Sequence, residues 1–167
     1  DLPVQTGERG QAAPALGVIV VDDGEGEAAK DLCAGIAATA RAEIRYVRSR
    51  MAPRGGPSAA RNQGIRMAAA EIVCLLDDDD RFLPSRFKTN VPLLQSGAAD
   101  VVLENVIRNY VDGSGRAAYL TGPVDAAADA FSMLISGDER SHIAPAATSF
   151  TKSVFRRSGG YDETLRE

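Results

Sequence analysis

The sequence predicts an α/β fold in which a mixed β-sheet is flanked by helices. Residues 16–21 (LGVIVV) and 72–76 (IVCLL) are short, uninterrupted apolar runs, which are typical of strands buried on both faces. Both runs end directly in aspartates, at Asp22 and Asp77. Stretches that favour helix separate the runs, and this alternation of strands and helices indicates a sheet covered by helices.

The N-terminal half of the chain alternates predicted helices with predicted strands. An Ala-rich stretch over residues 28–42 predicts a helix, and residues 44–47 predict a short strand. Proline and glycine are dense in residues 50–57, which indicates a loop, and good helix formers predict a helix over residues 58–70. The side chains expected to face inward are Leu32, Ile36 and Ala40 in the first helix, and Ala60, Gly64, Met67 and Ala68 in the second.

The C-terminal half is predicted to begin with a helix over residues 84–95, whose first turn is favoured by Pro84. Residues 112–115 (DGSG) are a strong turn signal, so two strands are expected to meet there. The other predicted elements are strands over 100–110 and 117–120, a helix over 126–135, an extended segment over 146–150 and a short helix over 151–158.

Length and composition favour one compact domain over residues 1–167. The chain has 44% hydrophobic and 25% charged residues, which are ordinary values for globular proteins. Its net charge of −4 argues against a nucleic-acid partner, because nucleic-acid binders usually carry a basic face. No apolar run approaches the roughly 20 residues that span a bilayer. We therefore expect no membrane span in this segment, and the sequence makes no prediction of oligomeric state.

The two cysteines, Cys33 and Cys74, lie far apart in apolar segments. They predict free, buried thiols rather than a disulfide, which favours a reducing compartment. No basic-then-apolar leader opens the segment. We therefore expect a cytoplasmic location, with the inner face of the membrane as the alternative.

Four consecutive aspartates, Asp77 to Asp80, follow the second apolar run. Their charges repel by about 1 kcal/mol for a pair 4 Å apart in water, and by more near protein, so something should compensate them. In an extended or turning backbone, Asp77 and Asp79 point to the same side. Two such carboxylates can ligate Mg²⁺ or Mn²⁺ that also grips a diphosphate. The ion would polarise the leaving group.

The placement of this cluster distinguishes a ligand site from a solvated acidic turn, which remains the alternative. The cluster follows an apolar strand, and ligands of open α/β sheets bind at the carboxyl ends of strands. Asp22 and Asp23 end another such strand, so the two acidic strand ends are expected to converge. Arg61 lies in the next helix, where its planar donors would meet a base or a diphosphate. A surface salt bridge is the weaker explanation of Arg61.

Three segments resemble family-2 glycosyltransferases, which transfer sugars from nucleotide diphosphates. Residues 18–27 (VIVVDDGEGE) resemble the family's strand ending in Asp-Asp-Gly-Ser. Residues 55–87 (GGPSAARNQGIRMAAAEIVCLLDDDDRFLPSRF) resemble its helix, strand and DxD region, and this match is the most specific. Residues 149–165 (SFTKSVFRRSGGYDETL) resemble the stretch before the catalytic base, which usually reads Gly-Gly-Phe-Asp-Glu. The first segment lies near the start of the chain and the last near its end, so the resemblance extends over nearly the whole chain.

The resemblance implies a GT-A fold, a Rossmann-like mixed sheet flanked by helices, and roles for individual residues. Asp23 would contact the nucleotide base, and Arg61 would assist in binding the nucleotide. Asp77 would lie near the ribose, and Asp79 would hold the metal. Four adjacent aspartates leave the register of the DxD motif open. The nucleotide-binding set is then Asp22, Asp23, Arg61, Asp77 and Asp78, the metal ligands are Asp79 and Asp77, and Asp80 has no fixed role.

The acceptor side is marked by weaker signals. His142 would border the acceptor in a loop, and a solvent-exposed or structural histidine is the more frequent alternative. Tyr161 would stack on a sugar, with packing under the sheet as the stronger alternative. Asp162 and Glu163 complete this set.

Two departures from the family pattern predict an interior fragment. Residues 1–10 (DLPVQTGERG) resemble only the end of the family's first helix, so the first strand is expected to be absent. The family's general base is an acidic residue shortly after Gly-Gly-Phe-Asp-Glu, whereas this sequence ends at Glu167, a poor substitute. The base is expected beyond Glu167, and the fragment alone is expected to be unstable and inactive.

The sequence thus predicts a metal-dependent, inverting glycosyltransferase. The donor would be a UDP-, GDP- or TDP-linked sugar, and the acceptor a hydroxyl of a polysaccharide, glycolipid or glycoprotein. An α/β nucleotidyltransferase would also place carboxylates at a strand end, but would open with a glycine- and arginine-rich phosphate loop, of which Arg9 and Gly10 are a feeble version. A noncatalytic nucleotide-binding or interaction module stays open as the second alternative.

Overall fold

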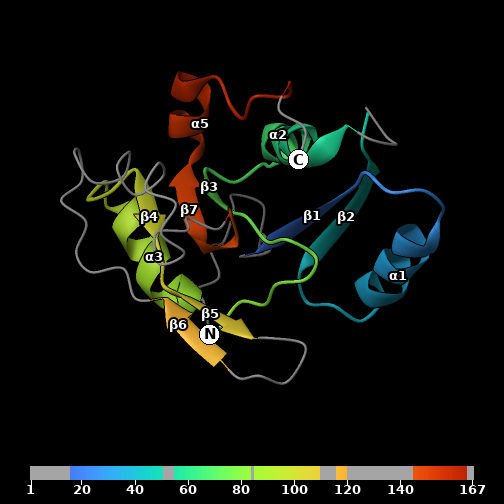
Figure 1. Cartoon of the computed structure of the whole chain (residues 1–167), viewed down its shortest axis with the longest axis horizontal. Coiled ribbons are helices and arrows are strands. Elements are labelled where there is room, and N and C mark those ends of the chain that lie inside the picture. The colour runs from blue at the N-terminus through green and yellow to red at the C-terminus, as the bar shows by residue number, and fades with distance from the viewer. Residues whose placement is uncertain (1–15, 51–54, 84, 110–115, 120–144, 165–167) are drawn as a thin grey trace, which may run out of the picture. The chain divides into compact units, whose positions relative to one another are not determined.

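The computed structural model describes residues 16–50, 55–83, 85–109, 116–119 and 145–164 (Figure 1). The predicted turn over 112–115, the predicted helix over 126–135 and His142 lie outside these residues. The chain divides into two compact units. The first comprises residues 1–73 and 152–167, and the second comprises residues 74–151.

A parallel strand pair frames the first unit. β1 (Gly17–Asp22) pairs with β2 (Glu43–Arg48). α1 (Ala28–Ala37) lies between them in the chain, because parallel neighbours need a crossover connection. The register places Asp22 opposite Arg48. Both strands therefore deliver their last residues to the same edge of the sheet.

The second helix of this unit packs closely on β1. α2 (Gly56–Met67) follows β2 and contacts β1. A Cβ added to Gly64 would lie 3.2 Å from Cγ2 of Val21, so glycine permits the close approach and Gly64 faces inward, as predicted. The chain then enters β3 (Ile72–Cys74), and α5 (Lys152–Ser158) belongs to the first unit again.

The second unit combines short strands with one face of a helix. β7 and β4 belong to a three-stranded sheet with the strand order β3-β7-β4, and a separate antiparallel pair is formed by β5 and β6. α3 packs against β4 and β7. The elements are α3 (Arg86–Gln95), β4 (Val101–Leu103), β5 (Val106–Asn109), β6 (Arg116–Tyr119), a 3₁₀ turn (Pro145–Ala147) and β7 (Thr148–Thr151).

The single strand predicted over residues 100–110 is two strands, β4 and β5. The ladder breaks at Glu104, whose N–H donates to the carbonyl of Ala147 at 3.0 Å. The carboxylate of Glu104 pairs with Arg86 at 2.7 Å. An ion pair therefore lies at the position where β4 ends, and a pattern of apolar residues alone does not reveal it.

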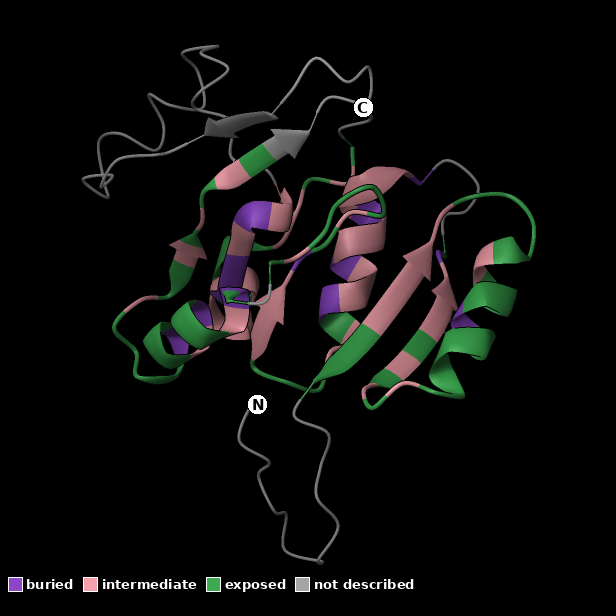
Figure 2. Ribbon diagram, turned by 90° about the horizontal axis from the view of Figure 1, so that it is seen from below, coloured by how far each residue is buried: buried purple, intermediate pink, exposed green. Residues whose placement is uncertain are grey.

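The predicted burial of β1 and α1 is wrong in part. No residue of β1 or β2 is fully buried (Figure 2), because β1 hydrogen-bonds to β2 alone among the described residues. In α1 the buried residue is Cys33, whereas Leu32 is 65% and Ile36 is 48% exposed. Each residue turns the helix by about 100°, so the stripe containing Leu32 faces away when Cys33 faces in. The predicted third member, Ala40, lies beyond the helix end.

The buried side of α2 also differs from the prediction. Ala59, Asn62 and Ile65 are buried, whereas Ala60 and Met67 are half-buried. The inward stripe is therefore centred on a polar residue, which a search for apolar spacing passes over.

Two expectations about chemistry and environment can be compared with the described residues. Cys33 and Cys74 are both free thiols, and Cys33 is buried while Cys74 is half-buried. Within the described ranges, none of the helices combines the length and the apolar character that crossing a membrane requires.

Candidate functional site

The carboxylate of Asp22 is held at the end of β1 by three donors. Its Oδ2 accepts hydrogen bonds from the Tyr46 hydroxyl at 2.7 Å and from Arg48 Nη1 at 3.1 Å, and its Oδ1 accepts one from the N–H of Gly24 at 2.8 Å. The bonds from Tyr46 and Gly24, with the charge of Arg48, outweigh partial burial and lower the pKa of Asp22 below its usual 3.8. Asp22 is therefore engaged in shaping the strand end.

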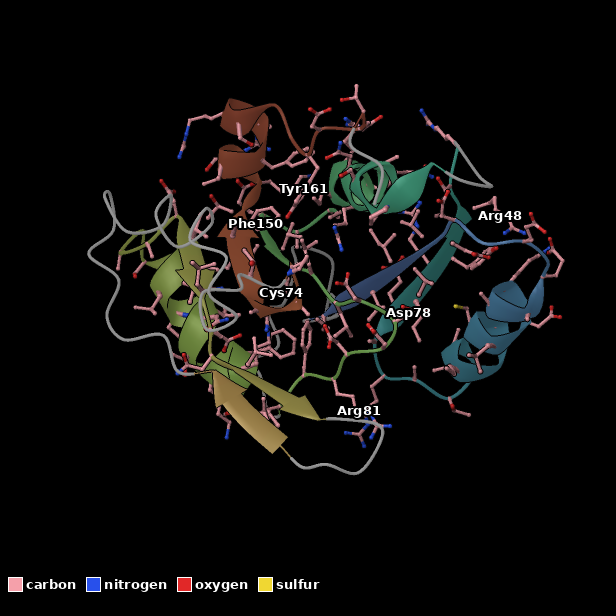
Figure 3. All side chains as sticks on the ribbon, in the orientation of Figure 1. Arg48, Cys74, Asp78, Arg81, Phe150 and Tyr161 are labelled. Carbon is pink, nitrogen blue, oxygen red and sulfur yellow. The ribbon has the colours of Figure 1, made fainter. Side chains whose placement is uncertain are left out.

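Arg48 hydrogen-bonds several groups of the loop that follows β1. Besides Asp22, its guanidinium donates to the carbonyl of Gly24 at 2.6 Å, to the carbonyl of Gly26 and to the carboxylate of Glu27 at 3.4 Å. Figure 3 labels Arg48 where β1 and β2 end together. Five donors in one plane suit this task. Arg48 therefore fixes the loop in which Asp23 lies.

Replacing Tyr46 with phenylalanine is expected to destabilise the protein at neutral pH and to have less effect in acid. Because the pKa of Asp22 is lowered in the folded state, its hydrogen bonds add stability above about pH 4, and this contribution disappears as the pH falls through the lowered pKa. Urea unfolding of both proteins at pH 7, 5 and 3 measures the difference. Asp22→Asn is the control, since it removes the titrating group. A difference independent of pH would refute the assignment.

Asp23 caps the N-terminus of α2. Its two carboxylate oxygens accept hydrogen bonds from the N–H of Gly55 at 3.3 Å and of Gly56 at 2.8 Å. A helix N-terminus offers unpaired N–H groups and favours negative charge. The cap orients Asp23, and a carboxylate with two bonds retains lone pairs for a further donor.

Arg61 lies one turn and a half into α2 and faces the C-terminal segment of the same unit. The guanidinium carbon is 5.9 Å from the centre of the Tyr161 ring, a distance at which a cation is attracted by an aromatic face. Figure 3 shows Tyr161 beside α2. The predicted nucleotide-binding Arg61 and the predicted acceptor-side Tyr161 are thus neighbours.

Asn62 ties the segment around Tyr161 to α2. Its side chain is 1% exposed. Its Nδ2 donates to the carbonyl of Tyr161 and to Oε1 of Glu163, both at 2.8 Å, and its Oδ1 accepts the N–H of Tyr161 at 2.9 Å. The three hydrogen bonds of this amide group are therefore directed at two residues of the predicted acceptor side, Tyr161 and Glu163.

The two acidic residues of this segment are also hydrogen-bonded. Asp162 accepts bonds from the N–H and the hydroxyl of Thr164 at 2.8 and 2.6 Å, and these bonds lower the pKa of Asp162. The bond from Asn62, followed by the interactions with Arg66, lowers the pKa of Glu163. Both groups are thus carboxylates at neutral pH and are positioned by their neighbours.

Replacing Gly160 with alanine is expected to cost more stability than the same change at Gly159. Both glycines have positive φ, 91° and 84°, so alanine strains either position by about 1–2 kcal/mol. A Cβ on Gly160 would also lie 2.8 Å from Oδ1 of Asn62 and 2.9 Å from the Phe155 ring, whereas one on Gly159 meets nothing within 4 Å. Overpacking adds about 2 kcal/mol. Thermal melting of the two variants measures the gap, and equal melting temperatures would show that Asn62 and Phe155 yield freely.

The four aspartates of the second unit form a turn directly after β3. The N–H of Asp80 donates to the carbonyl of Asp77 at 3.1 Å, which closes the turn. Asp77 is half-buried and the other three are exposed. Figure 3 shows Asp78 on the segment between β3 and α3. Partial burial, followed by the charges of Asp79 and Asp77, raises the pKa of Asp80. The carboxylates therefore repel one another, as predicted.

Arg86 is a buried cation at the first residue of α3. It is 7% exposed, and it donates to the carbonyl of Thr148 and to the Ser149 hydroxyl, each at 3.1 Å. It pairs with Glu104 and also donates to the carbonyl of Ala146. The guanidinium covers the ring of an aromatic residue near the turn, Phe82, at 4.2 Å from its centroid.

Arg48, Asn62 and Arg86 are the functional candidates that the sequence interpretation missed. Arg86 heads the buried stripe of α3, which continues at Asn90 and Leu94. Asn62 stands between Ala59 and Ile65 in the stripe of α2. Asn62 and Arg86 both follow the helical spacing of the buried residues beside them. A search for that spacing finds them only when it accepts polar residues at inward positions.

The described residues contain no group of three or more histidine, cysteine, aspartate or glutamate side chains arranged to hold a metal ion. Mg²⁺ and Mn²⁺ with a nucleotide need fewer protein ligands, because one or two carboxylates, the phosphates and water complete the shell. The hard oxygen donors of Asp77 and Asp79 fit that chemistry.

The fold and these strand ends define a mixed α/β protein with carboxylates placed at the ends of β1 and β3. The family model described as glycosyl transferase family 2 matches residues 9–157. The chain belongs to this family, and the predicted family and GT-A type of fold are confirmed. The match stops before Gly159, so it does not include the segment from Gly159 to Glu163. A search of curated proteins found no match.

Proposed function

We propose that this chain transfers a sugar from a nucleotide-diphosphate donor to a hydroxyl acceptor. Membership of glycosyl transferase family 2 supports sugar transfer at the level of the family. The observation that carries the proposal is the turn from Asp77 to Asp80, which follows β3 directly. Four adjacent carboxylates in a turn at a strand end favour a cationic ligand, and a metal bound to a diphosphate is such a ligand.

Asp77 and Asp79 would hold Mg²⁺ or Mn²⁺, with Asp78 beside the nucleotide. The bound ion supplies Lewis-acid stabilisation of the departing diphosphate. The work of the chain is to keep these carboxylates in place. The closed turn between Asp77 and Asp80 supports this role.

The nucleotide would be bound by the strand-end residues of the first unit. Asp23 is the proposed contact to the base, and its orientation by Gly55 and Gly56 supports that role. Arg61 would help to bind the nucleotide. Asp22, whose carboxylate is used by Tyr46 and Arg48, would act by holding the loop.

The acceptor would lie near Tyr161, Asp162 and Glu163, with His142 as a further candidate. Tyr161 presents an aromatic ring beside Arg61, and sugars stack on aromatic faces. A carboxylate C-terminal to Glu163 would deprotonate the acceptor hydroxyl, which then displaces the diphosphate with inversion at the anomeric carbon. General-base catalysis of this kind contributes about 10²- to 10⁴-fold.

The donor is proposed to be a UDP-, GDP- or TDP-linked sugar and the acceptor a growing polysaccharide, glycolipid or glycoprotein, in cell-wall or polysaccharide synthesis. The cytoplasm, or the inner face of the membrane, is where such donors would meet the protein.

Calorimetric titration tests the proposal. The protein is titrated with UDP, GDP and TDP, each with and without Mn²⁺. We expect one of the three to bind, and to bind more tightly with Mn²⁺. Binding of none of them, with the protein shown to be folded by circular dichroism, would favour a noncatalytic interaction module. Equal binding with and without Mn²⁺ would remove the metal from the proposal.

A further inference from the structure

Both ends of the acidic segment are attached to one carbonyl group. The segment leaves β3 at Leu75 and enters α3 at Arg86. The N–H of Leu75 donates to the carbonyl of Thr148 at 3.4 Å, and Nη2 of Arg86 donates to the same oxygen at 3.1 Å. Thr148 begins β7, the central strand of its sheet. The loop carrying the four aspartates is therefore closed at its base on the first residue of β7.

Arg86 forms the stronger half of this closure. The bond from Leu75 is long for a hydrogen bond, whereas that from Arg86 has normal length and carries a charge. Arg86 is itself held in place by the hydroxyl of Ser149, which also accepts a bond from Asn90 at 3.0 Å. Ser149 and Asn90 are both 0% exposed. The guanidinium therefore has little freedom to move.

A second contact joins Arg86 to Phe82, in the part of the loop that leads into α3. Its guanidinium carbon is 4.2 Å from the centre of the Phe82 ring, and Phe82 stands two residues after Asp80. Phe82 also meets Phe87 edge to face, with ring centres 5.6 Å apart. The descending arm of the loop is thus fixed against the start of α3.

From this geometry we propose that Arg86 is a positioning residue that holds the acidic turn in the shape required for metal and diphosphate binding. The inference rests on the proposed function of Asp77 and Asp79. Four adjacent carboxylates repel one another, and this repulsion would open a loop that is not tied at its base. A cation that needs two carboxylates at fixed distances binds weakly to an open loop, because closing the loop is then part of the cost of binding.

Arg86→Lys is the variant that tests this role. Lysine retains a positive charge beside Glu104 and Phe82, so the unit is expected to stay folded. Its single ammonium group lacks the fork that reaches Thr148 and Ser149 together. Two control variants come from the same helix. Lys88→Gln removes an exposed positive charge, and Leu94→Val loosens the buried stripe away from the loop.

Two measurements are made well below the melting temperature of each variant. The first is Mn²⁺ affinity in the presence of UDP, GDP or TDP, whichever the wild-type protein binds. We expect Arg86→Lys to weaken Mn²⁺ binding roughly ten- to a hundredfold, as for other groups that orient metal ligands. The second is the rate of trypsin cleavage after Arg81, an exposed residue of the loop, without metal. We expect this rate to rise in Arg86→Lys and to stay unchanged in both controls.

The outcomes separate the inference from the function on which it rests. If the wild-type protein binds Mn²⁺ with the diphosphate and Arg86→Lys binds it equally well, Arg86 serves the core alone and the inference is wrong. If Leu94→Val weakens Mn²⁺ binding as much as Arg86→Lys, loosening of the unit explains the effect and the inference is also wrong. If the wild-type protein binds no Mn²⁺ although cleavage after Arg81 responds to Arg86→Lys, the metal-binding function fails while the anchoring of the loop stands.

Discussion

Replacing Asp79 with alanine is expected to weaken Mn²⁺-dependent binding of the nucleoside diphosphate by at least about a hundredfold, or nearly 3 kcal/mol. The carboxylate of Asp79 is the proposed ligand of the metal, and it is exposed on a closed turn where water or an ion can reach it. Loss of a direct ligand should exceed the ten- to a hundredfold effect that is usual for groups behind the ligands.

The same variant is expected to be more stable than the wild-type protein when no metal is present. Partial burial, followed by the charges of Asp79 and Asp77, raises the pKa of Asp80, so these neighbours disfavour a further negative charge in the turn. Removing one carboxylate relieves about 1 kcal/mol of repulsion, which corresponds to roughly 2–4 °C in melting temperature for a chain of this size. Weaker binding together with higher stability excludes unfolding as the cause of the loss.

Isothermal titration with Mn²⁺ and differential scanning calorimetry measure these two effects. Asp31→Ala is the matched control, because it removes one exposed carboxylate from α1 and changes the net charge equally. Asp77→Ala should behave as Asp79→Ala does. If Asp78→Ala and Asp80→Ala abolish binding instead, the metal-binding pair is shifted by one residue. Unchanged Mn²⁺ binding in all four variants would end the metal assignment.

Strands β1, β2 and β3 were predictable because their signal is local. β1 and β2 differ from the expected strands by only one residue at each end, and β3 starts where its apolar run starts. A short apolar run next to aspartate and glycine leaves few alternatives. For the same reason, the sequence correctly predicted that aspartates stand at the end of β1 and shortly after β3.

The faces of the helices were less predictable, because burial depends on partners distant in sequence. Asn62 is buried through bonds to Tyr161 and Glu163, about a hundred residues further along. Arg86 is buried through bonds to β7, about sixty residues away. Neither partner can be read from the helix itself. A rule that places apolar residues inside therefore missed both residues.

The end of β1 also shows how function and support are divided between adjacent residues. Sequence interpretation assigned Asp22 and Asp23 to the same nucleotide-binding set. In the structure Asp22 is used by Tyr46 and Arg48, whereas Asp23 caps α2. Neighbouring side chains of a strand point to opposite faces. One aspartate therefore supports the loop, and the other is the better candidate for contact with a ligand.

Replacing Asn62 with leucine is expected to lower the free energy of unfolding by about 3 kcal/mol, or the melting temperature by roughly 10 °C. Leucine has a similar size but removes the amide that bonds the N–H and the carbonyl of Tyr161, in a site that is 1% exposed at residue 62. Each buried group that loses its partner costs about 1–3 kcal/mol. Gln63→Leu is the comparison, since Gln63 also bonds through its amide, to Arg48 and Arg50, but is only half-buried.

Asn62→Asp separates the hydrogen bonds from the packing. The new carboxylate keeps the acceptor for the N–H of Tyr161, but it sets an oxygen against the Tyr161 carbonyl and the Glu163 carboxylate, where Nδ2 now donates at 2.8 Å to each. The variant should be unstable at pH 7 and recover as the pH falls toward 4, because protonation restores a donor. Adding Glu163→Gln should recover part of the loss at pH 7. If Asn62→Asp melts like the wild-type protein, the amide does not hold the segment from Gly160 to Glu163 against α2, and Arg61 and Tyr161 owe their proximity to something else.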